Sequence, residues 1–149
     1  MSYTNDWISK LDDSAIAELA NTLRRIDPRF MKASQMYEGA TRTWFQGKEP
    51  YFDVVFETKA EQILWFQITL RGKSLSWNST YPDQIQAGET DELDAPISKA
   101  NYSASAIIEG NADLDQRYLN VVIALLKHRS DDPLFNQMAT RFETLSNPG

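Results

Sequence analysis

The sequence of 149 residues contains no cysteine and a single histidine, His128. Without cysteine the chain forms no disulfide, holds no zinc through thiolates and has no thiol nucleophile. A catalytic triad needs a histidine base beside a nucleophile, but His128 stands in a basic run whose charge suits the C-terminal end of a predicted helix. We therefore expect no catalytic residues of these kinds, and the sequence favours a protein that is not an enzyme.

The six glycines are isolated from one another, at positions 39, 47, 72, 88, 110 and 149. That spacing forms neither a phosphate-cradling loop nor a dinucleotide fingerprint. The acidic segment 89–94 carries several carboxylates, but it lacks the spaced ligands, turn glycine and terminal glutamate of a calcium loop. The sequence therefore predicts no cofactor and no metal site.

Long apolar runs are also missing, because no window of about 18 apolar residues exists and the N-terminus has no apolar signal-peptide core. We expect a cytoplasmic protein that does not contact a membrane. The net charge of −6 opposes binding to a phosphate backbone. A modest basic patch at the end of the first predicted helix, formed by Arg24, Arg25, Arg29 and Lys32, is a weak phosphate site. We expect no nucleic-acid partner.

Apolar residues make up 42% of the chain and charged residues 24%, which is typical of a globular protein. At this length folding buries roughly two-thirds of the unfolded surface, enough for one core. We predict a single domain over residues 1–149. The patterns occur in the order helix, strands, helices, which predicts the α+β class, with a four- to five-stranded antiparallel meander preceded by one helix and followed by two.

Three amphipathic helices are predicted from apolar residues spaced at i, i+3, i+4 and i+7. The first spans 13–26, is capped by Asp12 or Asp13 and ends before Pro28. The inward residues are expected to be Ile16, Leu19, Ala20, Leu23 and Ile26 in this helix; Leu114, Tyr118, Leu119, Val121, Val122, Leu125 and Leu126 in the second, capped by Asn111 or Asp113; and Leu134, Met138, Phe142 and Leu145 in the third, which opens at Asp132-Pro133.

Alternating apolar and polar side chains predict a strand over 62–71. Gly72-Lys73 has the glycine-first chemistry of a two-residue type II′ turn, which pairs Leu70 with Leu75. The face assigned to packing consists of Phe52, Val54, Phe56, Leu64, Phe66, Ile68, Leu70, Leu75 and Trp77.

Two more connections define the preceding strands. A four-residue loop over 47–50 pairs Phe45 with Phe52. Keeping Phe52 and Leu64 on one face requires either an odd loop, such as 59–61, or a β-bulge. A fifth short strand is expected near 84–87.

The opposite side of this sheet, the predicted second face, is unusually apolar for a solvated surface. It carries Arg42, Trp44, Tyr51, Asp53, Val55, Glu57, Ile63, Trp65, Gln67, Thr69 and Arg71. Val55 is expected opposite Trp65, with Trp44 on the neighbouring strand. Aromatic patches of this size usually contact something, and three occupants are open: a helix of the same chain, a protein partner or second copy, and a small molecule.

Two functional hypotheses follow. The first is a non-enzymatic interaction, adaptor or chaperone-like protein that holds a protein partner or forms a homodimer through this face. The second is a small-molecule-binding protein or simple hydrolase, with a site between the sheet and the loop-rich segment 79–112. In that second case Asp53, near Trp44 and Gln67, acts as a polar contact or as a desolvated base. The acidic segment 89–94 is the alternative source of polar contacts. The residues expected at either site are Trp44, Tyr51, Asp53, Val55, Ile63, Trp65 and Gln67.

Overall fold

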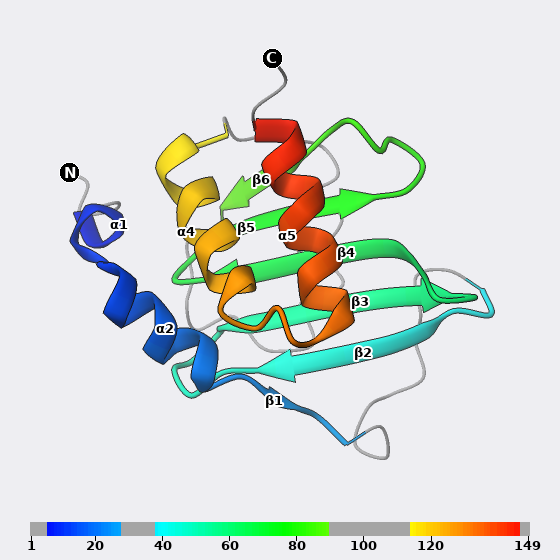
Figure 1. Cartoon of the computed structure of the whole chain (residues 1–149), viewed down its shortest axis with the longest axis horizontal. Helices are drawn as coiled ribbons and strands as arrows, with labels where there is room; N and C mark the ends of the chain where they lie inside the picture. The colour runs from blue at the N-terminus through cyan, green and yellow to red at the C-terminus, as the bar shows by residue number, and fades with distance from the viewer. Residues whose placement is uncertain (1–5, 28–37, 90–113, 147–149) are drawn as a thin grey trace. The chain divides into compact units, whose positions relative to one another are not determined.

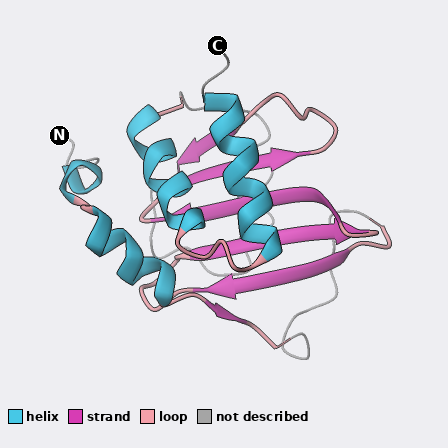
Figure 2. Cartoon of the chain, viewed as in Figure 1, coloured by secondary structure: helices cyan, strands magenta, loops and turns pink. Residues whose placement is uncertain are grey.

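The computed structural model describes residues 6–27, 38–89 and 114–146 (Figure 1). The chain divides into two compact units. The two ends of the sequence, Met1–Thr22 and Leu114–Gly149, form a helical unit, whereas Leu23–Asp113 form a sheet unit. Helices and strands segregate along the chain in this way (Figure 2), which confirms the predicted α+β class.

The sheet has six strands in sequence order, and every neighbouring pair is antiparallel. It is therefore a meander, as predicted. The short fifth strand expected near 84–87 is present at one edge, and a further strand, not predicted, lies at the other edge. The strands are β1 (Arg24–Arg25), β2 (Thr41–Gln46), β3 (Asp53–Lys59), β4 (Gln62–Leu70), β5 (Lys73–Asn78) and β6 (Gln86–Glu89).

The hairpin between β4 and β5 turns one residue earlier than predicted. Arg71 and Gly72 form its two-residue loop, and both have positive φ, at 51° and 86°. Positive φ at both central positions belongs to a type I′ turn, so the predicted type II′ turn at Gly72-Lys73 is wrong. Leu70 pairs with Lys73 instead of Leu75. Because the register changes by two residues, each side chain keeps its predicted face.

The hairpin between β2 and β3 is displaced by one residue in the opposite direction. Phe45 pairs with Val54 rather than with Phe52, and the Gly47 amide donates to the Phe52 carbonyl at 2.8 Å. The loop therefore starts at Lys48, one residue later than predicted. A Cβ at Gly47 would collide with the ring of Phe52, so glycine is required where the ring crosses the backbone.

The connection between β3 and β4 contains the predicted β-bulge. Ala60 and Glu61 form a two-residue loop, so the three-residue alternative is wrong. The register shifts between Glu57 and Thr58: Glu57 pairs with Trp65, whereas Thr58 pairs with Ile63. Leu64 is the extra residue, and the bulge restores the alignment of the apolar side chains farther along both strands.

One face of the sheet, named here the apolar face, holds the sheet's core. Phe52, Val54, Phe56, Phe66, Ile68 and Leu70 are completely buried on this face, and Phe45, Leu75 and Trp77 are nearly so. The rings of Phe45 and Phe66 both lie against Phe56, with centroids 6.2 and 5.2 Å away. The alternation of the sequence identified this face correctly, apart from Leu64, which is only half-buried at the bulge.

The first long helix is shorter than its apolar pattern predicts. The structure has a short helix α1 (Asp6–Lys10) and then α2 (Asp13–Asn21), capped by Asp12, whose Oδ1 accepts from the Ala15 amide at 2.8 Å. The chain continues as β1 instead of reaching residue 26 as a helix. Arg24 and Arg25 pair with Gln46 and Phe45, because β2 offers an edge to pair with. The predicted basic patch at a helix end is therefore wrong for these two arginines, and Arg29 and Lys32 lie outside the described residues.

The helical unit is completed by α4 (Gln116–Lys127) and α5 (Pro133–Ser146), which lie side by side and run in opposite directions (Figure 1). Asp115 caps α4, so the predicted caps Asn111 and Asp113 are wrong, and Leu114 precedes the helix with 43% of its surface exposed. The predicted cap Asp132 is confirmed by its bond from the Leu134 amide. The buried residues of α5 are Phe135, Met138, Ala139 and Phe142, so Leu134 and Leu145 lie at the margin of the stripe.

Candidate binding face of the sheet

The side of the sheet opposite the apolar face is named here the polar face, because most of its buried side chains carry polar atoms. The strand register assigns it Arg42, Trp44, Gln46, Asp53, Val55, Glu57, Trp65, Gln67, Thr69, Ser74 and Ser76. Five of these, Glu57, Trp65, Gln67, Ser74 and Ser76, are buried, whereas the other six, from Arg42 to Thr69, are half-buried. The face therefore combines aromatic rings with desolvated polar groups.

Two directly opposite residues of this face, Arg42 on β2 and Glu57 on β3, form an ion pair. Arg42 pairs across the strands with Glu57, and its Nε donates to Glu57 Oε2 at 2.9 Å while Nη2 donates to the same oxygen. The Glu57 side chain is fully buried. The guanidinium also lies 5.6 Å from the ring centroid of Trp65, within range of a cation–π interaction. The buried charge of Glu57 is thus neutralised by a neighbour that is itself held by an indole.

The neighbouring carboxylate, Asp53, has indole and amide contacts instead. Trp44 Nε1 donates to Asp53 Oδ1 at 3.3 Å, and the Gln46 side chain forms a second hydrogen bond. Burial raises the pKa of Asp53 above its usual value, and these two hydrogen bonds only partly oppose the rise. Within the described ranges no cation pairs with Asp53, in contrast to Glu57.

Two buried oxygen atoms on the same face as Asp53 have no hydrogen-bond partner among the described residues: Gln67 Oε1 and Ser74 Oγ. Their residues keep only 7% and 1% of their surface exposed. Thr69 pairs with both Asp53 and Ser74, and Gln67 is two residues before Thr69 on β4, so Gln67 is diagonal to both. A buried acceptor without a partner costs about 1 to 3 kcal/mol, which makes this cluster costly for stability alone.

The predicted site residues separate into two groups. The polar face holds five of them, Trp44, Asp53, Val55, Trp65 and Gln67. Val55 pairs with Gln67, so its predicted position opposite Trp65 is wrong. This pairing differs because the β3–β4 register contains the bulge and a two-residue loop.

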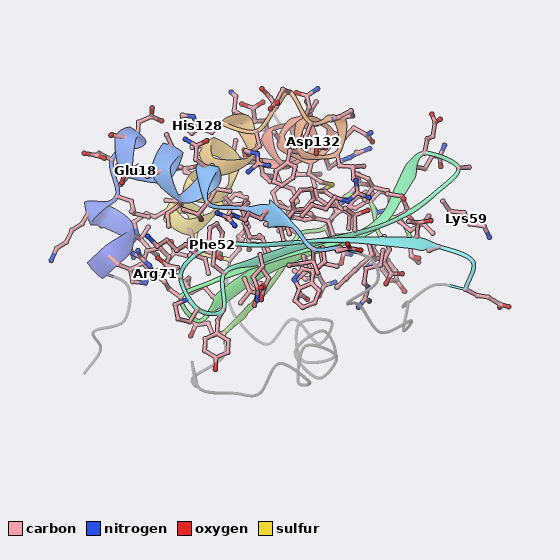
Figure 3. The ribbon with its side chains drawn as sticks, turned by 90° about the horizontal axis from the view of Figure 1, so that it is seen from below. Glu18, Phe52, Lys59, Arg71, His128 and Asp132 are labelled. Atoms are coloured by element: carbon pink, nitrogen blue, oxygen red, sulfur yellow. The ribbon has the colours of Figure 1, made fainter. Side chains whose placement is uncertain are left out.

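Three other residues of the predicted second face lie elsewhere. Ile63 is opposite Thr58, in step with Phe56 and therefore aligned with the apolar face. Tyr51 stands in the β2–β3 loop with φ of 60°. Arg71 lies in the β4–β5 turn, where its Nε donates to Glu49 Oε2 at 2.8 Å. This hydrogen bond raises the pKa of the Arg71 guanidinium. Arg71 and Phe52 thus lie at the end of the sheet opposite Lys59 (Figure 3).

Sequence reasoning omitted Ser74, Ser76 and Gln46 from the site. The signal for the two serines was present, because β5 alternates Ser74, Leu75, Ser76 and Trp77, and the apolar members were assigned to the core. Serine was overlooked because an isolated hydroxyl is unremarkable on a solvated strand. Its burial, which makes it informative, is a tertiary property.

Other candidate sites receive little support. His128 is the C-cap of α4, and its Nε2 lies 3.2 Å from Asp13 Oδ1, a pair in which both side chains are partly exposed. Among the described residues, no group of three or more acidic, histidine or cysteine side chains is placed to hold a metal ion. Over the same ranges no helix has the length and apolar character needed to cross a membrane. The predicted acidic segment lies almost entirely outside the described residues.

Comparison with protein-family models, with curated proteins and with solved structures finds no match to this chain.

Proposed function

We propose that this protein is a non-enzymatic binding protein that holds a small polar molecule on the polar face of its sheet. The observation that supports the proposal is a pair of buried oxygens, Gln67 Oε1 and Ser74 Oγ, on the same face as the desolvated carboxylate of Asp53. Neither oxygen has a hydrogen-bond partner among the described residues. Small-molecule sites commonly consist of aromatic and apolar walls with a few fixed polar groups. Trp44 and Val55 supply such a wall beside Asp53 and Gln67.

The arrangement favours binding over catalysis. General acid–base chemistry needs a second group to receive, position or return a proton, and nucleophilic catalysis needs a base beside the nucleophile. Among the described residues no base is hydrogen-bonded to Ser74 Oγ. Asp53 is hydrogen-bonded to an indole and an amide. Asp53 acting alone as a base is therefore the less favoured reading of the same residues.

A protein partner or a homodimer, the first expectation from the sequence, stays a prediction, as does the cytoplasmic location. An aromatic anchor contributes to association by losing exposed area to the partner. Trp65 and Ile63 are buried just as Gln67 and Ser74 are, so exposed area favours neither a protein partner nor a ligand. The two oxygens without a partner among the described residues favour the ligand. Polar groups without partners gain hydrogen bonds when a ligand supplies them.

The proposal is tested by a thermal-shift screen of small metabolites against the wild-type protein, Asp53→Asn and Gln67→Leu. A ligand at 100 times its Kd stabilises the folded state by about 2.7 kcal/mol, which raises Tm measurably. Both variants are expected to abolish that rise. Asp131→Asn, which removes an exposed aspartate of the helical unit, is the charge-matched control and should keep it. Stabilisation that survives both substitutions would show that the ligand binds elsewhere.

A further inference from the structure

The polar face carries two carboxylates, Glu57 and Asp53, and each has an indole nearby, but among the described residues only Glu57 has a cation. Glu57 has an indole opposite it, Trp65, and a cation, Arg42, which contacts both the carboxylate and the indole. Asp53 also has an indole, Trp44, which donates to it at 3.3 Å. In the part of the chain that the structure describes, Asp53 has no cation.

The atoms around Asp53 that lack partners are suited to accept hydrogen bonds. Gln67 Oε1 is an acceptor only, and the hydroxyl of Ser74 can accept as well as donate. Arg42 already donates twice to Glu57. Arg24 pairs with Gln46, which in turn pairs with Asp53, so this exposed arginine lies two strands from Asp53 on the same face. The carboxylate of Asp53 would repel an anionic ligand, and the amide oxygen of Gln67 could not donate to it, whereas a ligand rich in donors would satisfy both.

We infer that Asp53, Gln67 and Trp44 form a site for the ammonium group of a small organic amine, with Ser74 available to a second polar atom of the same ligand. This inference rests on the proposed function and specifies its ligand class. An ammonium carries three donors and a full positive charge, so it completes at Asp53 the arrangement that Arg42 provides at Glu57. Diagonal neighbours on adjacent strands lie about 7 to 8 Å apart, close enough for one nitrogen to bond side chains from both.

Other cations fit these residues less well. Calcium and magnesium are held by several oxygen ligands that usually include more than one carboxylate, and this cluster contains only Asp53. A guanidinium presents donors in a planar fork that matches one carboxylate edge. The acceptors here come from β3 and β4, so they approach from separate strands, which suits the rotatable donors of an ammonium better. The negative net charge of the chain also favours a cationic ligand.

The test is an NMR titration of the full-length protein with n-butylammonium chloride near neutral pH, where the amine is protonated as lysine is. Signals of the Trp44 indole N–H and of the Gln67 side-chain amide are followed, the first assigned with Trp44→Phe. Saturable shifts of both are expected. Asp53→Asn should weaken binding at least tenfold, because it removes the charge while keeping an oxygen that can accept from Trp44. Asp131→Asn should leave the affinity unchanged.

One further probe, n-butanol, separates the possible outcomes. n-Butanol has the same chain without the charge. If it bound as tightly as butylammonium, the ammonium class would be overturned while the site on the polar face remained. If neither probe moved the two signals while the metabolite screen gave a ligand sensitive to Asp53→Asn, the class alone would again fail. Shifts that were unaffected by Asp53→Asn would overturn the site as well.

The source of the ammonium is tested with Nα-acetyl-lysine methylamide, which presents the same group on a peptide unit. We commit to a free amine, so this probe should bind no more tightly than butylammonium. Binding of the lysine derivative at least tenfold more tightly would overturn the free amine and identify a lysine side chain of a protein as the source. Thermal melts of each variant confirm that the fold is retained.

Discussion

Glu57 and Asp53 lie on the same face of one sheet, yet their carboxylates have different hydrogen-bond partners. Glu57 is fully buried and receives two hydrogen bonds from Arg42, whose guanidinium also contacts Trp65. Asp53 is less buried and receives an indole and an amide, and burial raises its pKa. A buried charge is tolerated when it is paired. Glu57 therefore has the cationic partner that a buried carboxylate needs in a stable fold. Asp53 has no such partner among the described residues, and the oxygen of Gln67 near it accepts no hydrogen bond from them.

The largest effect is expected from breaking the completed pair. Arg42→Met removes the guanidinium and leaves the buried carboxylate of Glu57 without it, which should lower the free energy of unfolding by about 3 to 5 kcal/mol. Urea denaturation measures the loss. The double variant Arg42→Met/Glu57→Leu should recover most of it, because replacing both partners by apolar groups is often close to neutral. A loss below about 1 kcal/mol would contradict the assigned role of Arg42.

The second prediction concerns the unused acceptor. Gln67→Leu removes a buried oxygen that has no partner, so it should raise the free energy of unfolding by about 1 to 3 kcal/mol while removing ligand binding. Gln62→Leu, on the same strand but exposed, is the matched control and should change stability little. Destabilisation by Gln67→Leu would mean that the amide contributes to the fold, and the contrast between Glu57 and Asp53 would disappear.

Asp53→Asn should sharpen the contrast through pH. The folded protein raises the pKa of Asp53 above 3.8, so the stability that this residue contributes is complete below its unfolded pKa and is lost as pH rises through the folded pKa. The variant has no such loss. Its stability relative to wild type should therefore increase across that interval and stay constant above it. Chemical denaturation at a series of pH values measures the difference, and a constant difference would refute the raised pKa.

The smallest effect is expected for an exposed ion pair in the helical unit. Lys127 Nζ lies 2.7 Å from Glu143 Oε2, but both side chains are about half exposed. Solvent screening reduces such pairs to about 0 to 1 kcal/mol. Glu143→Gln should therefore change the urea midpoint barely, in contrast to Arg42→Met. A loss comparable to that of Arg42→Met would show that burial does not explain the difference between the two pairs.

Much of the sheet was predictable because side chains alternate with a period of two. Both displaced hairpins kept their predicted faces, since moving a two- or four-residue loop by one position changes the pairing by two. The choice of Arg71-Gly72 over Gly72-Lys73 was not predictable from residue preference. It places a non-glycine residue at φ of 51°, and the side chain of that residue is bonded to Glu49 on another loop.

The helical predictions failed where local pattern and tertiary pairing disagree. Leu23 and Ile26 continue the apolar spacing of α2, but the chain leaves the helix at Thr22, and Arg24 and Arg25 pair with β2. Periodicity cannot detect this competition because the partner strand is some twenty residues away. The caps Asp12 and Asp132 were predicted correctly, whereas Asp115 was missed.

Of the candidate site, the sequence by itself determined that Trp44, Asp53, Val55 and Gln67 lie together, because alternation assigns all four to one side of adjacent strands. Only the tertiary structure decided which of these polar atoms are buried and which have partners. Those properties depend on the bulge at Leu64, on the exact register and on the surroundings of each oxygen. Residue identity fixes a side chain's donors and acceptors, whereas burial and the neighbouring atoms decide whether they are satisfied.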